Sequence, residues 1–156
     1  NYVSTIGIMK FNYTRMQGDN MQRIKSEQFE LQIKINVCEA DISLPVNTIL
    51  NVGVRSCDFS ANISMDVDIR RVISFAKGLL QLYTTLSGIV RLEETYGMHN
   101  FIEFSAEKGG HIKIKGQFKA LCDGFSHELA FENEIDQTYL HGFAESILND
   151  STTYFA

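Results

Sequence analysis

The chain has 156 residues, of which 44% are apolar and 21% are charged. This composition is typical of a globular protein and argues against disorder. The formal net charge of −5 argues against binding to nucleic acid or to an anionic membrane, because phosphate groups require a basic patch. No apolar run approaches the length of a membrane span, and the length predicts a single domain over residues 1–156.

The three cysteines, Cys38, Cys57 and Cys122, occur in unrelated contexts, and none belongs to a C-x-x-C pair. An odd number of separated cysteines is typical of a reduced protein. We therefore expect buried thiols in a cytoplasmic protein. The N-terminal residues show no signal-peptide pattern, which agrees with that location.

In the first half of the chain, alternating apolar and polar residues predict strands. We expect an edge strand at residues 2–13 and a half-buried strand at residues 29–37. The apolar phase then shifts by one residue, which predicts a bulge and a continuation of the strand as far as Leu44. A third strand is predicted at residues 57–65.

The middle of the chain predicts a helix, because apolar residues from Ile69 to Leu86 recur at three-and-four spacing. Asp66 or Asp68 is the expected N-cap, and Gly88 is expected to end the helix. Four strands follow, at about 89–94, 101–106, 111–121 and 126–134, and a last amphipathic helix is predicted at about 137–149.

This order of elements predicts an α+β fold with antiparallel pairing. We expect a strongly twisted antiparallel sheet of about six to seven strands, with one helix inserted mid-chain and one C-terminal helix packed on it. No internal repeat is evident in the sequence.

Asp123-Gly124 predicts a two-residue hairpin turn, since a type I′ turn needs positive φ at both central residues. With this turn at the centre, opposite residues have numbers that sum to 247, and one register pairs charges with charges and apolar residues with apolar residues. The expected pairs are Lys119 with Glu128, Lys115 with Glu132, Lys113 with Glu134, Phe118 with Leu129, Gly116 with Phe131, and Ile112 with Ile135. We therefore interpret the basic and acidic runs as a solvated ladder and not as binding patches.

The step Asp136-Gln137-Thr138 lies where this ladder ends and the last helix begins. Asp136 or Thr138 can accept hydrogen bonds from the first-turn amides. A catalytic carboxylate would need a partner in a cleft, and the sequence places neither a second carboxylate nor a histidine there. The pattern favours a helix cap.

Catalytic and metal-binding motifs are missing from the sequence: it contains no H-E-x-x-H, P-loop, dinucleotide fingerprint or nucleophile elbow. Cys122 and His127 flank one turn, but two ligands do not make a zinc site, and we expect His127 to be a half-buried core residue. We expect no enzyme, no metal and no cofactor.

The second half of the chain contains short sequence motifs in a familiar order. A core helix "VISFAKGLLQLYTTLSG" precedes an "FIEF" strand, "GGHIKIKG", "HELAFENEIDQTYL" and a terminal amphipathic helix. Over about residues 67–148 this resembles the WapI-type bacterial immunity proteins of polymorphic, contact-dependent toxin systems. The resemblance implies a cytoplasmic, non-enzymatic protein that binds and blocks a cognate toxin domain, and it carries over no catalytic residue.

A partner is expected to dock on acidic groups that the strand register leaves unpaired, beside aromatic side chains. The stretch "RLEETYGMHNF" offers such a set at one hairpin end: Glu93, Glu94, Tyr96, Met98 and His99. The alternative patch is the small, polar strand face of Ser56, Asp58, Ser60, Asn62 and Ser64. Because many toxin domains are basic, complementary charge would speed their association with this acidic chain.

Two other functions stay open at this point. A small-molecule-binding sheet protein would enclose a pocket lined by Phe59, Phe104, Phe118, Phe131 and Tyr83, although dense core packing explains these residues as well. An unrecognised hydrolase would use Asp58 or Asp66 together with a histidine.

Overall fold

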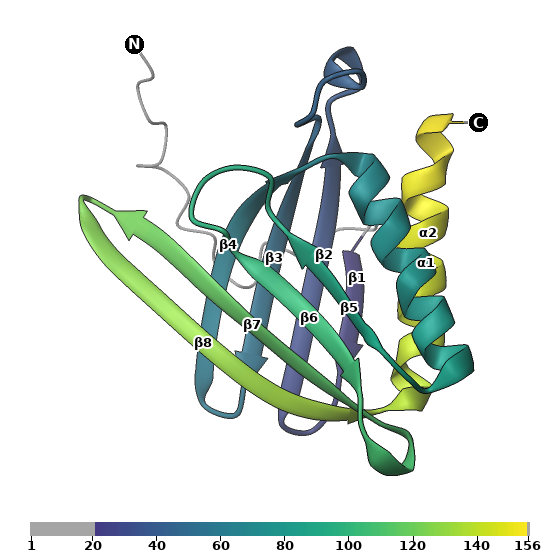
Figure 1. Ribbon diagram of the computed structural model, residues 1–156. Helices are drawn as coiled ribbons and strands as arrows, with labels where there is room; N and C mark the ends of the chain where they lie inside the picture. The colour runs from purple at the N-terminus through teal and green to yellow at the C-terminus, as the bar shows by residue number, and fades with distance from the viewer. Residues whose placement is uncertain (1–20, 156) are drawn as a thin grey trace.

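The computed structural model of the chain describes residues 21–155, and the edge strand expected at residues 2–13 lies outside this range. The described elements fall into two runs, each made of four strands and a helix (Figure 1). The first run is β1 (Met21–Lys25), β2 (Phe29–Val37), β3 (Thr48–Ser56), β4 (Phe59–Val67) and α1 (Ile69–Thr85). The second is β5 (Ile89–Glu93), β6 (Phe101–Ala106), β7 (His111–Cys122), β8 (Phe125–Asp136) and α2 (Leu140–Thr152).

Each run forms its own antiparallel sheet, with neighbours in chain order: β1-β2-β3-β4 in sheet A and β5-β6-β7-β8 in sheet B. The predicted α+β class, the mid-chain helix and the C-terminal helix are confirmed. The expected single sheet of six to seven strands is replaced by eight described strands in two sheets, because α1 carries the chain from β4 to the far layer and β5 begins a new ladder. The order of elements is repeated even though no repeat is visible in the residues.

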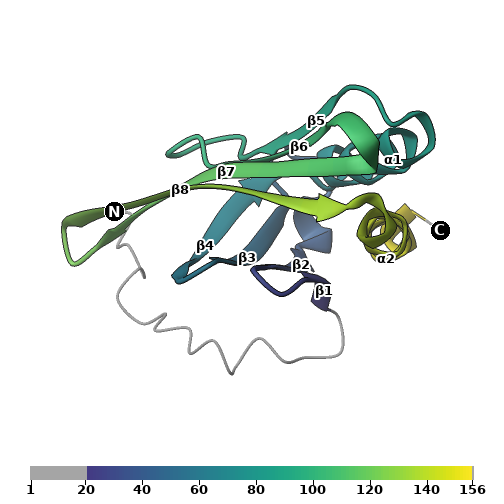
Figure 2. The same cartoon turned by 90° about the horizontal axis from the view of Figure 1, so that it is seen from below.

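The two sheets are layered with their strands running in different directions, and both helices lie side by side along one margin of the layers (Figures 1 and 2). The buried side chains of both sheets and both helices form one apolar cluster. Phe131 of sheet B links the layers, since its ring centroid lies 6.2 Å from that of Phe29 in sheet A and 5.2 Å from that of Phe118. The ring of Phe104 lies between Phe75 of α1 and Phe143 of α2.

The first half of the chain contains most of the differences from expectation. β1 and β3 were not predicted, although Leu50, Val52 and Val54 of β3 alternate with residues of the other face. The predicted continuation of β2 to Leu44 is wrong. The backbone N–H of Cys38 donates to Asn47 O at 2.8 Å, so residues 38–47 form a closed loop that contains a 3-10 turn, η3 (Glu39–Asp41).

The strand expected at residues 57–65 begins two residues later, because Cys57 and Asp58 form the turn between β3 and β4 and Cys57 takes a positive φ of 53°. Cys57 is therefore exposed, and so are Cys38 and Cys122. The prediction of buried thiols is wrong, because Cys38 and Cys57 lie in connections between strands and Cys122 is the last residue of β7, next to the hairpin turn.

The hairpin register is confirmed at every predicted pair. Asp123 and Gly124 have φ values of 51° and 82°, as a type I′ turn requires. Lys113 and Lys115 form ion pairs with residues other than those opposite them in β8: Lys113 Nζ lies 3.4 Å from Glu132, on the diagonal, and Lys115 Nζ lies 3.3 Å from Glu103, which is opposite it in β6. His127 is exposed and not half-buried in the core, since it lies near the end of the hairpin, past the residues of β7 that pair with β6.

α1 is capped as predicted, and the predicted cap at Asp136 begins the 3-10 turn that leads into α2. The Asp68 side chain accepts from the Arg70 backbone N–H at 3.0 Å and caps α1. Burial opposes ionisation of Asp68, but hydrogen bonds from the Arg70 amide, the Asn47 side chain and the Arg70 guanidinium outweigh it and lower its pKa. Asp136 accepts from Thr138 N–H at 2.9 Å, which lowers its pKa and starts the 3-10 turn η5 (Gln137–Tyr139) ahead of α2.

Candidate functional site

The connection between β5 and β6 is held in shape from inside by Glu94. This side chain is only 7% exposed, and its Oε1 accepts from the backbone N–H of Met98 at 2.8 Å and of Asn100 at 3.0 Å. The backbone N–H of Glu94 also donates to Asn100 O at 2.9 Å. A buried carboxylate with these donors fixes the loop, because charge-assisted hydrogen bonds in a dry environment are strong.

Asn100 attaches the other end of the loop to β7. It is 4% exposed, its Nδ2 donates to Lys119 O at 3.1 Å, and its Oδ1 accepts from Lys119 N–H at 2.7 Å. At the opposite side, Thr95 N–H donates to Asp66 O at 2.8 Å and so joins the loop to the end of β4. The loop is thus fastened to both sheets.

The residues between these anchors point outward. Tyr96 is 61% exposed, Met98 is 36% exposed, and the His99 side chain is 77% exposed. His99 also takes a positive φ of 58°, a conformation that costs energy in a non-glycine residue. We call Tyr96, Met98 and His99 the loop surface. It offers apolar and aromatic area without needing to order first, which lowers the entropic cost of binding.

The two acidic residues predicted to be unpaired here are not unpaired. Glu93 Oε1 lies 3.4 Å from Arg91 Nη2 and 4.0 Å from His99 Nδ1, and it remains partly exposed. Glu94 is buried with its carboxylate turned toward the amides of its own loop. The Glu94 carboxylate is therefore turned away from the surface, and it holds the loop in shape.

The end of the β7–β8 hairpin lies at the same end of sheet B as this loop, past the Asn100–Lys119 bonds, and was not predicted as part of the site. β6 pairs with β7 only as far as Gln117, so the hairpin extends past it as a two-stranded arm. Leu121 and Phe125 on this arm are 45% and 72% exposed. Their exposure could have been predicted from the sequence, because they lie next to the Asp123-Gly124 turn, past the part of β7 that pairs with β6.

Asp58, the remaining predicted site residue, is exposed in the β3–β4 turn. The loop surface adjoins the other end of β4, through the Thr95–Asp66 bond. At about 3.3 Å per residue the seven steps from Phe59 to Asp66 span roughly 23 Å, so Asp58 belongs to a separate surface. The alternative strand face is incomplete too, because Ser56 is 7% exposed and its hydroxyl accepts from Asn133.

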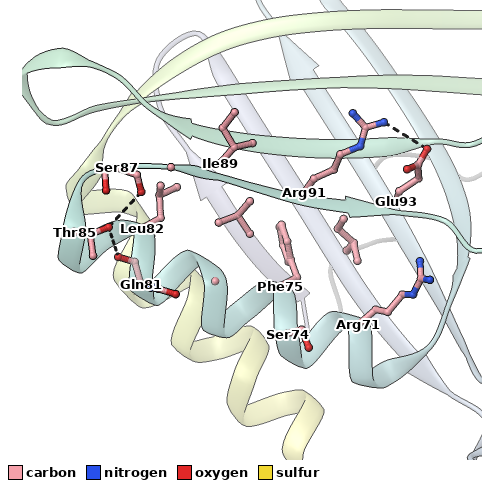
Figure 3. Close-up of a pocket in the computed structure, with 14 residues that line it drawn as sticks. Arg71, Ser74, Phe75, Gln81, Leu82, Thr85, Ser87, Ile89, Arg91 and Glu93 are labelled. Atoms are coloured by element: carbon pink, nitrogen blue, oxygen red, sulfur yellow. Dashed lines mark hydrogen bonds and ion pairs between the residues drawn. The ribbon is translucent and has the colours of Figure 1, made fainter.

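The aromatic pocket of the small-molecule interpretation is not formed. Phe104, Phe118 and Phe131 are buried against other rings in the core, whereas Phe59 is 66% exposed and Tyr83 is 37% exposed beside His141. A different hollow of about 720 Å³ lies between α1 and β5. Figure 3 shows its two walls, with Phe75 and Leu82 between them.

In the part of the chain that the structure describes, no three His, Cys, Asp or Glu side chains gather into a metal-binding group. No helix within residues 21–155 is both long and apolar enough to cross a membrane.

These features define an α+β protein made of two layered antiparallel sheets, each followed by a helix. A family model described as the immunity protein WapI-like family matches residues 21–154, and the chain belongs to this family. The resemblance seen in residues 67–148 is confirmed, and it extends across sheet A. Membership implies a protein toxin as the partner class.

A search of curated proteins finds no significant match. One similar solved structure is described as "Crystal structures of trypanosoma bruciei MRP1/MRP2"; it is 11% identical, has a TM-score of 0.48 and covers 92% of each chain.

Proposed function

We propose that this protein binds the toxin domain encoded beside its own gene and neutralises it without catalysis, docking through the loop surface. The observation that carries the proposal is the internal clamp on the loop: Glu94 and Asn100 are buried and bonded, while Tyr96, Met98 and His99 between them are exposed. The clamp holds these three exposed side chains in place, which lowers the entropic cost of binding a partner.

The chemistry of the loop surface fits a protein partner. Tyr and Met are enriched at the centres of interfaces, and rigid aromatic anchors contribute most of the binding energy. The arm residues Leu121 and Phe125 enlarge the apolar area at the same end of sheet B. Glu93 at the rim and the net charge of −5 favour a basic toxin domain, because complementary charge steers association.

A cell-survival experiment tests this function. The toxin domain from the neighbouring gene is expressed with the wild-type chain or with the double variant Tyr96→Ser/Met98→Ser. We expect the wild type to restore growth and to co-purify with the toxin domain, and the double variant to fail in both. Tyr139→Ser is the matched control, since Tyr139 is 42% exposed and follows the end of β8 that pairs with His111, away from the loop.

A wild-type chain that neither restored growth nor captured the toxin domain would contradict the function. If the double variant protected as well as the Tyr139→Ser control, the function would stand and the loop surface would be wrong as the docking site. The cytoplasmic location also stays a prediction.

A further inference from the structure

β5 is the outer strand of sheet B, and β6 is its only partner strand among those described. Hydrogen bonds from Ala106 N to Gly88 O at 3.1 Å and from Glu94 N to Asn100 O at 2.9 Å show that the even-numbered residues face β6. In an antiparallel ladder the alternate residues point the other way. Ile89, Arg91 and Glu93 therefore direct their backbone N–H and C=O groups to the outer edge.

The hollow between α1 and β5 runs along this edge. Its walls are α1 from Arg71 to Thr85 and the segment from Ser87 to Glu93, and its volume is about 720 Å³ (Figure 3). The α1 side is lined by small or polar residues such as Ser74 and Gly78. The Val90 side chain packs against Gly78, where a Cβ would lie 2.9 Å from Val90 Cγ1, so side chains of an added strand would lie beside this contact. Ile89 is 67% exposed, an apolar side chain in the middle of an otherwise polar rim.

Each two-fold register of β5 with a second copy of the chain meets an obstacle. Two-fold pairing centred on Arg91 would place Arg91 opposite Arg91, and like charges directly opposite are destabilising. Centring on Leu92 would place Arg91 opposite Glu93, but these two side chains already pair with each other within one chain. The same register would place Ile89 opposite Thr95, whose N–H is already bonded to Asp66 O. Centring on Val90 would place Arg91 opposite Ile89 and Glu93 opposite Ser87, so neither charge would gain an opposite charge across the pair.

A strand from another protein is not bound by this two-fold symmetry, so it can end before Thr95 and carry a different order of charges. We propose that an extended segment of the toxin domain pairs with the outer edge of β5 and becomes a further strand of sheet B. The segment carries an acidic residue opposite Arg91 and a basic residue opposite Glu93. On the two sides of the residue that faces Arg91 it carries apolar residues, opposite Val90 and Leu92, which lie over the hollow. Main-chain bonds give affinity in this mode of binding, and alternate side chains give specificity.

This inference rests on the proposed function and adds the mode of recognition. β5 runs directly into the connection that carries the loop surface, with Glu93 as its last residue. One partner can therefore pair with β5 and contact Tyr96 and Met98 without a break. The Thr95–Asp66 bond marks where the pairing stops and the loop contact begins.

Backbone hydrogen exchange tests the pairing directly. In the free protein we expect the amides of Arg91 and Glu93 to exchange fast and the amide of Leu92, bonded to β6, to exchange slowly. Adding the toxin domain should slow exchange at Arg91 and Glu93 by about tenfold or more, with little change at Leu92. Unchanged exchange at Arg91 in a formed complex would overturn strand addition and leave the proposed function standing.

A proline variant gives a second, independent test. Ile89→Pro removes an outward N–H and leaves the bonds to β6 in place, a change that edge strands tolerate. We expect it to weaken toxin binding about tenfold or more, whereas Ile89→Ala, which keeps the N–H, binds nearly as the wild type does. If both variants bound equally, strand addition would be wrong.

The remaining outcomes are equally decisive. Slow exchange of Arg91 in the free chain, lost on dilution, would show that a second copy occupies the edge and would overturn the proposal. A toxin domain that formed no complex with the wild type would overturn both this proposal and the function on which it rests.

Discussion

The ring of Phe131 fills the space that a side chain at Gly116 would need. A Cβ on Gly116 would lie 2.6 Å from Phe131 Cζ and 2.7 Å from the backbone oxygen of Phe101. Gly116 and Phe131 are directly opposite in the β7–β8 ladder, so the aromatic ring lies over the glycine and occupies the space that its missing side chain leaves. This pair places Phe131 where it can reach Phe29 and join the two sheets.

Gly116→Ala should therefore destabilise the fold by about 1–3 kcal/mol, since overpacking forces shifts of side chains and backbone. Gly142→Ala in α2 is the matched control: its Cβ would meet nothing within 4 Å, and helix propensity predicts a gain of roughly 0.5–1 kcal/mol. Urea unfolding measures both. Equal stabilities for the two variants would refute the packing explanation.

Gly124→Val should also destabilise the protein, by a different mechanism. A Cβ at Gly124 meets no atom within 4 Å, but φ is 82°, and left-handed backbone costs an L-residue about 1–2 kcal/mol or more when it is β-branched. Gly124→Asn should cost less, because Asn tolerates this region. Thermal melting that placed both variants at the wild-type midpoint would show that the turn is not under this constraint.

Asp68→Ala should cost about 0.5–2 kcal/mol at pH 7, because it removes the cap of α1. The folded-state pKa of Asp68 is lowered from 3.8, so its ionised form stabilises the fold above that pH. This contribution is lost as the pH falls below about 4 and through the folded-state pKa. Unfolding free energies of wild type and variant should converge on acidification, and a gap that stayed constant would contradict the assignment.

Glu93→Lys should slow association with a basic toxin domain and weaken the salt dependence of the rate, while leaving the fold intact. The reason is that Glu93 lies at the rim, where charges act mainly on encounter. Stopped-flow rates at two ionic strengths measure the effect. Glu94 is left unchanged because its burial would confound the result. A rate equal to the wild type at both salt concentrations would remove Glu93 from the docking region.

The elements that could be predicted from the sequence are those whose structure is decided by neighbouring residues. The Asp123-Gly124 turn fixes the register of twelve-residue strands, and Asp68 and Asp136 cap helices through bonds to residues two positions away. Period-two alternation identified β2, and three-and-four spacing identified α1. Each of these signals involves residues close together in the sequence, so it can be recognised without knowledge of the tertiary fold.

The predictions were wrong where contacts between residues far apart in the sequence decide the structure. Residues 38–44 alternate like a strand, yet Asn47 bonds to Ile42 O, Leu44 O and Ile69 N and closes a loop around them. The division into two sheets depends on where α1 delivers β5, which no local pattern encodes. In the candidate site, the exposure of Tyr96 and Met98 could be predicted, but the burial of Glu94 could not, since it depends on the loop folding back on its own carboxylate.

The central claim is that the loop surface binds the toxin domain of the neighbouring gene. Titration calorimetry with purified proteins tests it most directly, using the wild type, Tyr96→Ser/Met98→Ser and the control Tyr139→Ser. We predict that the double variant raises Kd at least about tenfold, equivalent to about 1.4 kcal/mol, with unfolding midpoints unchanged, and that the control binds as the wild type does. A double variant that kept the wild-type Kd would contradict the claim.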